Sequence, residues 1–118
     1  MAHILVIDDE ESIRFTFQRF LATREHEVIT AECYSAALSR MDKEYFDLIL
    51  ADINLGDGWG LDILHEVARR GLATRVIIMT AYPTSETRAV SVSRQAKDYL
   101  VKPLRQGTLV RSVENALR

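Results

Sequence analysis

Apolar residues are arranged along this chain in two alternating patterns. Runs of strand length occupy residues 4–7, 27–30, 47–51, 75–79 and 99–101. The three strongest runs, which are the first, third and fourth, do not alternate polar with apolar residues. Continuous apolar runs are typical of strands in a parallel sheet that helices cover on both faces. We therefore expect a buried parallel sheet of five strands.

Segments with helical periodicity follow these runs. Their apolar stripes are Ile13, Phe17, Phe20 and Leu21; Leu38 and Met41; Leu61, Leu64, Val67 and Ala68; and Leu109, Val110, Val113 and Leu117. We expect Ser35 to cap the second helix, and Thr84 or Ser85 to cap a polar fourth helix. Gly71 is a suitable end for the third helix. The alternation of strand and helix, repeated five times, predicts a doubly wound α/β fold with right-handed crossovers.

Length and composition restrict the class of protein. The 118 residues suffice for one domain, which is either a whole small protein or a part of a longer one. Fifteen basic and seventeen acidic residues give a formal charge of -2, which argues against direct nucleic-acid binding. Cys33 is the only cysteine, so an internal disulfide is excluded, and we expect this side chain to be buried.

Nothing in the sequence indicates a membrane or an export pathway. No apolar run approaches the roughly 20 residues of a membrane span. The first residues lead directly into an apolar run, without the charge and cleavage pattern of a signal peptide. We therefore expect a cytoplasmic domain that does not bind membranes.

Polar side chains stand at the ends of four of the five predicted strands. Asp8 and Asp9 follow the first run, Asp52 the third, Thr80 the fourth and Lys102 the fifth. Ligands of open parallel sheets bind outside the carboxyl ends of the strands, near the point where the strand order reverses. We therefore expect these five residues to converge on one edge of the sheet.

Such a cluster favours a particular chemistry. Three neighbouring carboxylates repel one another, and the single positive charge of Lys102 cannot balance them. Oxygen ligands suit Mg²⁺, Mn²⁺ or Ca²⁺ better than zinc, and Mg²⁺ often bridges carboxylates to a phosphate group. The hydroxyl of Thr80 and the ammonium of Lys102 can donate to phosphate oxygens. A remaining carboxylate could then become an aspartyl phosphate.

The ordered set of motifs resembles a known family. Asp8-Asp9, Asp52, Thr80 and the Lys102-Pro103 pair after residues 98–101 occur in the order found in receiver domains of bacterial two-component response regulators. Gly60, eight residues beyond Asp52, also matches, and the resemblance covers residues 1–118. It implies a single receiver domain with a flavodoxin-like (βα)5 fold and strand order 2-1-3-4-5. It also implies a phosphorylation-dependent signalling switch that catalyses only its own phosphotransfer and dephosphorylation.

The resemblance implies a role for each matching residue. Asp52 would accept a phosphoryl group from a phosphohistidine of a sensor histidine kinase or a phosphotransfer protein. Mg²⁺, or alternatively Mn²⁺, would be held by Asp8, Asp9, Asp52 and the backbone carbonyl of Asn54.

Three further residues would respond to the phosphoryl group. Lys102 would pair with it, Thr80 would move toward it, and Tyr99 would pass from an exposed to a buried position. The peptide bond before Pro103 would be cis. The fourth helix, fifth strand and fifth helix would form the output surface, through which the domain could form a homodimer or contact a partner. The stretch 85–90 resembles receivers that precede enhancer-binding ATPase domains, which suggests transcription regulation.

Three positions depart from the family pattern. Gly56 replaces a common proline four residues after Asp52, so we expect a more flexible loop there. Tyr34 and Gln95 stand where glycine is usual, so the local backbone should differ at both. None of the three belongs to the expected site.

Other interpretations of the same residues exist. Asp8 or Asp9 could cap the first helix, and Lys102 could be a solvated side chain. A flavin-binding protein of this fold needs a phosphate cradle after the first strand, where the acidic residues 8–11 would repel phosphate. A Mg²⁺-dependent phosphatase would place Asp-x-Asp-x-Thr there, and the chain has no such motif. In a degenerate receiver that only binds partners, the intact acidic, threonine and lysine set would be unexpected.

Overall fold

A computed structural model describes the whole chain, residues 1–118. The strands are β1 (His3–Ile7), β2 (Glu27–Ala31), β3 (Leu48–Asp52), β4 (Arg75–Thr80) and β5 (Asp98–Val101). The helices are α1 (Glu11–Ala22), α2 (Tyr34–Lys43), α3 (Leu61–Arg69), α4 (Ser85–Ser93) and α5 (Gln106–Ala116). All neighbouring strands pair in parallel, in the order β2-β1-β3-β4-β5. The expected fold class and strand order are confirmed.

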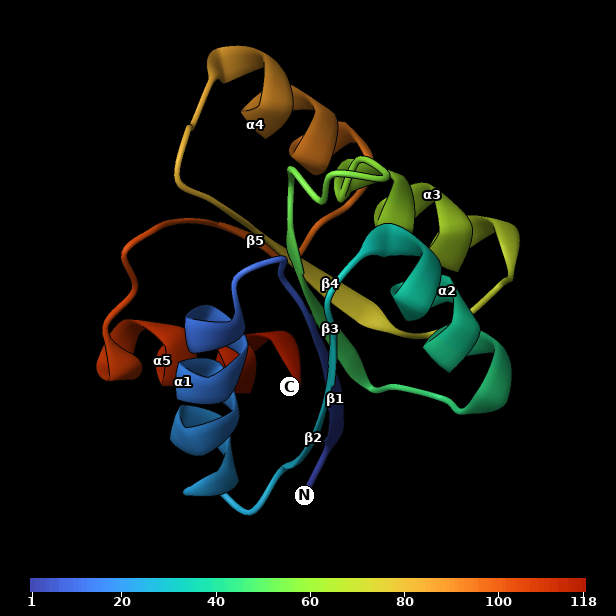
Figure 1. Ribbon diagram of the computed structural model, residues 1–118. Coiled ribbons are helices and arrows are strands. Elements are labelled where there is room, and N and C mark those ends of the chain that lie inside the picture. The colour runs from blue at the N-terminus through green and yellow to red at the C-terminus, as the bar shows by residue number, and fades with distance from the viewer.

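The helices form two layers around the sheet. Helices α1 and α5 cover one face, and α2, α3 and α4 lie on the other (Figure 1). Alternate residues of β1 therefore enter different cores: Leu5 and Ile7 pack with the second group of helices, and Ile4 and Val6 with the first. All four side chains are fully buried. Burial on both faces explains why this strand is continuously apolar.

Helix ends follow the sequence in two cases. Thr84 is the N-cap of α4, and its hydroxyl accepts a hydrogen bond of 3.0 Å from the backbone N–H of Thr87. Gly71 follows α3 with φ of +66°, the left-handed conformation that glycine adopts easily at helix C-termini. No helix of the chain has the length and apolar character needed to cross a membrane.

The prediction for the start of α2 was wrong. Ser35 lies inside the helix, and the N-cap is Cys33, whose side chain makes no capping bond. The carboxylate of Asp57 takes this role, since its two oxygens accept hydrogen bonds from the N–H groups of Tyr34 at 2.8 Å and Ser35 at 3.0 Å. An acceptor from the loop after β3 therefore replaces a local cap. Cys33 is half-buried rather than buried.

Candidate functional site

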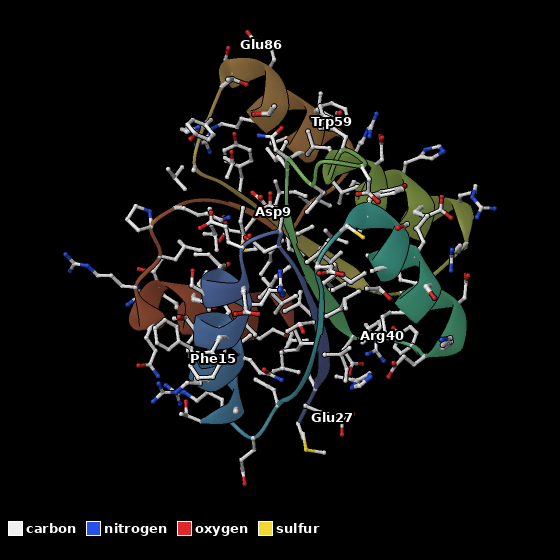
Figure 2. All side chains as sticks on the ribbon, viewed as in Figure 1. Asp9, Phe15, Glu27, Arg40, Trp59 and Glu86 are labelled. Carbon is white, nitrogen blue, oxygen red and sulfur yellow. The ribbon has the colours of Figure 1, made fainter.

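The strand-end residues meet at the carboxyl edge of the sheet. Asp8 follows β1, Asp52 ends β3, and these two strands are paired neighbours. Strand β2 lies beyond β1, and β4 lies beyond β3, so the strand order reverses between the two aspartates. Figure 2 shows the neighbouring Asp9 at this end of β1. The expected convergence at the reversal point is present.

Lys102 joins the ends of three strands. Its Nζ donates to Asp8 Oδ2 at 2.5 Å and lies 3.4 Å from Asp52 Oδ1. The side chain is only 8% exposed, so the solvated alternative does not hold. Burial acts to lower the pKa of Lys102, but the hydrogen bond and attraction to Asp8, together with attraction to Asp52, outweigh it and raise this pKa. The ammonium is therefore charged at neutral pH.

Asp52 is held in an unfavourable environment for a carboxylate. Burial raises the pKa of Asp52 to about 6, and the negative charges of Asp8 and Asp9 add to this effect. Lys102 opposes the shift without cancelling it. The site consequently carries more negative charge than its one ammonium balances.

The acidic group fits a hard divalent cation. Asp8, Asp9 and Glu10 each offer a carboxylate oxygen, and these atoms lie within 4.8 Å of one another. Together with Asp52 they form an all-oxygen, negatively charged donor set, which suits Mg²⁺. Glu10 was missed as a candidate ligand, although its place in the acidic run 8–11 was a usable signal.

The alternative role of Asp8 or Asp9, as the cap of the first helix, is not found in the structure. The N-cap of this helix is Glu10, which makes no side-chain capping bond. Asp8 Oδ1 instead accepts from the N–H of Glu10 at 2.9 Å. Arg14 of α1 donates to the backbone carbonyl of Asp8 at 2.7 Å. These bonds hold the turn after β1, and they leave Asp9 exposed at the mouth of the site.

Thr80 and Tyr99 lie on the side of the site that leads to α4. Thr80 is buried, and its hydroxyl accepts from the N–H of Tyr82 at 3.0 Å, with no hydrogen bond to Asp52. Tyr99 is also buried, and its hydroxyl shares a hydrogen bond of 2.7 Å with the hydroxyl of Thr87. The guanidinium of Arg88 lies 4.4 Å from the centre of the Tyr99 ring. The structure thus shows a buried Tyr99 whose hydroxyl is linked to α4.

The remaining expected residues lie in loops beside the site. Asn54 is exposed and pairs with Trp59 across the loop after β3. The Lys102–Pro103 peptide bond is cis, as expected.

Residues 4–114 match the family described as the response regulator receiver domain. The chain belongs to this family. Its members are regulatory phosphoacceptor domains. The chain is 37% identical, over 100 residues, to the alginate biosynthesis transcriptional regulatory protein AlgB of Pseudomonas syringae pv. tomato. That match covers 85% of the chain and 22% of AlgB, so the chain spans about a fifth of this relative.

Two solved receiver structures are similar. A CheY-like receiver domain from Methanospirillum hungatei JF-1 superposes with a TM-score of 0.94 at 26% identity, covering 99% of this chain and 94% of that one. A response regulator from Burkholderia pseudomallei, solved with a phosphorylated aspartic acid, a calcium ion and citrate, has a TM-score of 0.86 at 30% identity. The second match covers all of this chain and 67% of that one.

Proposed function

We propose that this receiver domain is a signalling switch in which Asp52 accepts a phosphoryl group from the phosphohistidine of a sensor histidine kinase or phosphotransfer protein. A carboxylate oxygen of Asp52 attacks phosphorus, the phosphorus–nitrogen bond breaks, and its electron pair stays on the imidazole. The observation that carries the proposal is the linkage of Asp52 and Asp8 by the buried ammonium of Lys102. A pKa of about 6 leaves Asp52 ionised, and therefore nucleophilic, at pH 7.5.

The acidic group supplies the metal site. Asp8, Asp9, Asp52 and the backbone carbonyl of Asn54 would hold Mg²⁺ or Mn²⁺, with Glu10 as a further carboxylate at the mouth. When bound, the ion neutralises charge on the transferring phosphoryl group. The calcium ion and phosphorylated aspartate in the Burkholderia neighbour support this arrangement. Lys102 is positioned to donate to phosphoryl oxygens in place of the carboxylate oxygen of Asp52.

Phosphorylation supplies the free energy for switching. It adds about one negative charge and three acceptor oxygens to Asp52. Each charge-assisted hydrogen bond contributes about 1.5–3 kcal/mol, and reversing a 1:99 equilibrium needs about 5.5 kcal/mol. Thr80 can exchange its Tyr82 partner for a phosphoryl oxygen. Thr80 ends the strand before α4, and the hydroxyl of Tyr99 is bonded to Thr87 of α4. This exchange would therefore change how α4 is held.

The output surface is the face of α4, β5 and α5. Val92 of α4 is 70% exposed, and Val101 of β5 is 41% exposed. We propose that the surface contacts a second copy or a transcriptional output domain more tightly after phosphorylation. AlgB is named a transcriptional regulatory protein, which supports an output of that kind. The cytoplasmic location stays a prediction.

Intact mass spectrometry tests the acceptor. Incubation with acetyl phosphate and Mg²⁺ should add about 80 Da, the mass of one phosphoryl group on a carboxylate nucleophile. The adduct should be absent without Mg²⁺ and in Asp52→Ala, and present in the control Asp42→Asn, which alters an exposed carboxylate on α2. An adduct that persists in Asp52→Ala would refute the acceptor assignment. Failure of the wild type to react with both acetyl phosphate and a phosphohistidine donor would refute the switch.

A further inference from the structure

The loop between β3 and α3 contains glycine at positions 56, 58 and 60. Gly56 has φ of +79° and stands where the family commonly has proline. Glycine loses more conformational freedom on ordering than any other residue. An ordered loop of this composition therefore needs contacts from outside itself, and the structure provides two.

The first contact is made by Asp57. Its carboxylate accepts the N–H groups of Tyr34 and Ser35, at 2.8 and 3.0 Å, across more than twenty residues of sequence. The side chain of Tyr34 also lies against Gly58, so closely that a Cβ atom at Gly58 would collide with it. The backbone bonds from Ser35 and Tyr34 lower the pKa of Asp57. One side of the loop is thus attached to the start of α2.

The second contact is made by Arg94, the residue after α4. Its Nη1 donates to the backbone carbonyl of Leu61 at 3.1 Å and to Asp62 Oδ1 at 3.0 Å. The guanidinium carbon lies 5.6 Å from the centre of a Trp59 ring. Figure 2 shows Trp59 beside α3 and α4. Arg94 thus attaches the end of α4 to the start of α3, and it contacts the loop itself through Trp59.

Both attachments can act on the residues nearest the site. Trp59 pairs with Asn54, and the N–H of Leu55 donates to the carbonyl of Gly58 at 3.2 Å. The N–H of Gly60 donates to the carbonyl of Ile53, next to Asp52. A displacement of Asp57 or Trp59 is therefore passed through this short hydrogen-bonded loop to Asn54.

We propose that Asp57 and Arg94 are positioning residues that hold the β3–α3 loop so that the carbonyl of Asn54 stays aligned for the metal. They provide a restraint that the glycine-rich loop does not supply by itself. This inference rests on the proposed function, because it assigns Asn54 to the metal site.

Calorimetric titration with Mg²⁺ tests the inference. Asp57→Ala and Arg94→Met should each weaken Mg²⁺ binding by about tenfold, as loss of a supporting contact does in other metal sites. The phosphorylation rate with acetyl phosphate at saturating Mg²⁺ should stay within about twofold of wild type, because the metal-bound loop regains its position. In metal-free protein, hydrogen exchange should accelerate at the amides of Leu55 and Gly60.

Conservative variants and matched controls separate positioning from general damage. Asp57→Asn keeps an acceptor oxygen for only one of the two N–H groups at the helix end, so it should weaken Mg²⁺ binding less than Asp57→Ala does. Asp42→Asn and Arg69→Met remove exposed ion-pair partners on α2 and α3 and should change nothing. Failure of the wild type itself to bind Mg²⁺ would count against the proposed function. Normal wild-type binding with equal affinity in Asp57→Ala, Arg94→Met and the controls would overturn only the loop inference, as would equal weakening in Asp57→Ala and Asp57→Asn.

Discussion

The backbone of Gly60 lies directly against the carbonyl of Asp52: a Cβ atom at Gly60 would overlap the oxygen of that carbonyl and touch its carbon. The backbone of β3 cannot move away from such a Cβ atom without displacing Asp52 from the site. We expect Gly60→Ala to lower the free energy of unfolding by about 2–3 kcal/mol, as overpacking does. The same variant should react slowly with acetyl phosphate, since the Asp52 backbone must shift.

Urea unfolding with a second glycine as control measures this effect. Gly107 lies in α5 with no atom within 4 Å of a Cβ placed there. Gly107→Ala should therefore raise the free energy of unfolding by about 0.5–1 kcal/mol through helix propensity. Equal stability changes in the two variants would contradict the close packing at Gly60.

Asp52 should make the metal-free protein less stable as the pH rises. Its pKa is raised to about 6 in the folded state, chiefly by burial, so protonation of Asp52 favours folding. This contribution to stability is fully present below the pKa of Asp52 in the unfolded chain, about 4. It is lost as the pH rises through about 6, the pKa of Asp52 in the folded state. Asp52→Asn removes the buried negative charge. Allowing for solvent screening, it should stabilise the protein by about 1–2 kcal/mol at pH 7.5.

Urea unfolding in EDTA at pH 4.5 and pH 7.5 checks this sign. The gain from Asp52→Asn should shrink at the lower pH, where wild-type Asp52 is protonated in the folded state. Asp42→Asn, at an exposed carboxylate, should show no such pH dependence. A variant that is destabilised at pH 7.5 would show that the attraction of Lys102 outweighs burial.

Strand positions and the convergence of Asp8, Asp52 and Lys102 could be predicted because both follow from local patterns. Burial on two faces requires continuous apolar runs, and parallel pairing brings all carboxyl ends to one edge. The caps at Thr84 and Gly71 are local as well, since each acts within a few residues of its own helix end.

Contacts between segments far apart in the chain could not be predicted, because they leave no local pattern in the sequence. Asp57 caps α2 from more than twenty residues away, and Arg94 reaches Asp62 across thirty-two. A carboxylate beside glycines is ordinary loop composition, so nothing in the sequence distinguishes Asp57 from a solvated side chain. Ser35 was the better local candidate for the cap, and it was wrong because a stronger acceptor arrives through the tertiary fold.

Gln95 has φ of +67° at a position where the family usually has glycine. In the left-handed conformation the Cβ atom lies too close to the backbone carbonyl oxygen, which costs about 1–2 kcal/mol. Glycine avoids this cost, but it loses more conformational entropy when the chain folds. We expect Gln95→Gly to raise the free energy of unfolding by about 0.5–1 kcal/mol. Glu25 has φ of +64°, so Glu25→Gly repeats the measurement at an independent position. If glycine destabilises both positions, side-chain contacts rather than backbone conformation decide them.

Lys102 is the only cation between two carboxylates, and Lys102→Met removes its charge with little change in side-chain volume. Asp8 is fully buried and Asp52 nearly so, and both lose their ammonium partner. Removing one member of a buried ion group leaves an uncompensated charge, which should lower the stability of the metal-free protein by about 2–3 kcal/mol at pH 7.5.

A divalent cation should compensate for this loss. Because Lys102 and the metal balance the same carboxylates, Lys102→Met should bind Mg²⁺ more tightly than wild type and gain more thermal stability from it. It should nonetheless form little phosphorylated Asp52, because the donor to the phosphoryl oxygens is missing. Melting temperatures in EDTA and in excess Mg²⁺ measure the gain, with Lys97→Met, an exposed lysine, as the control. Equal gains from Mg²⁺ in Lys102→Met and wild type would mean that the lysine and the metal do not share these carboxylates, and would separate the metal site from the acceptor site.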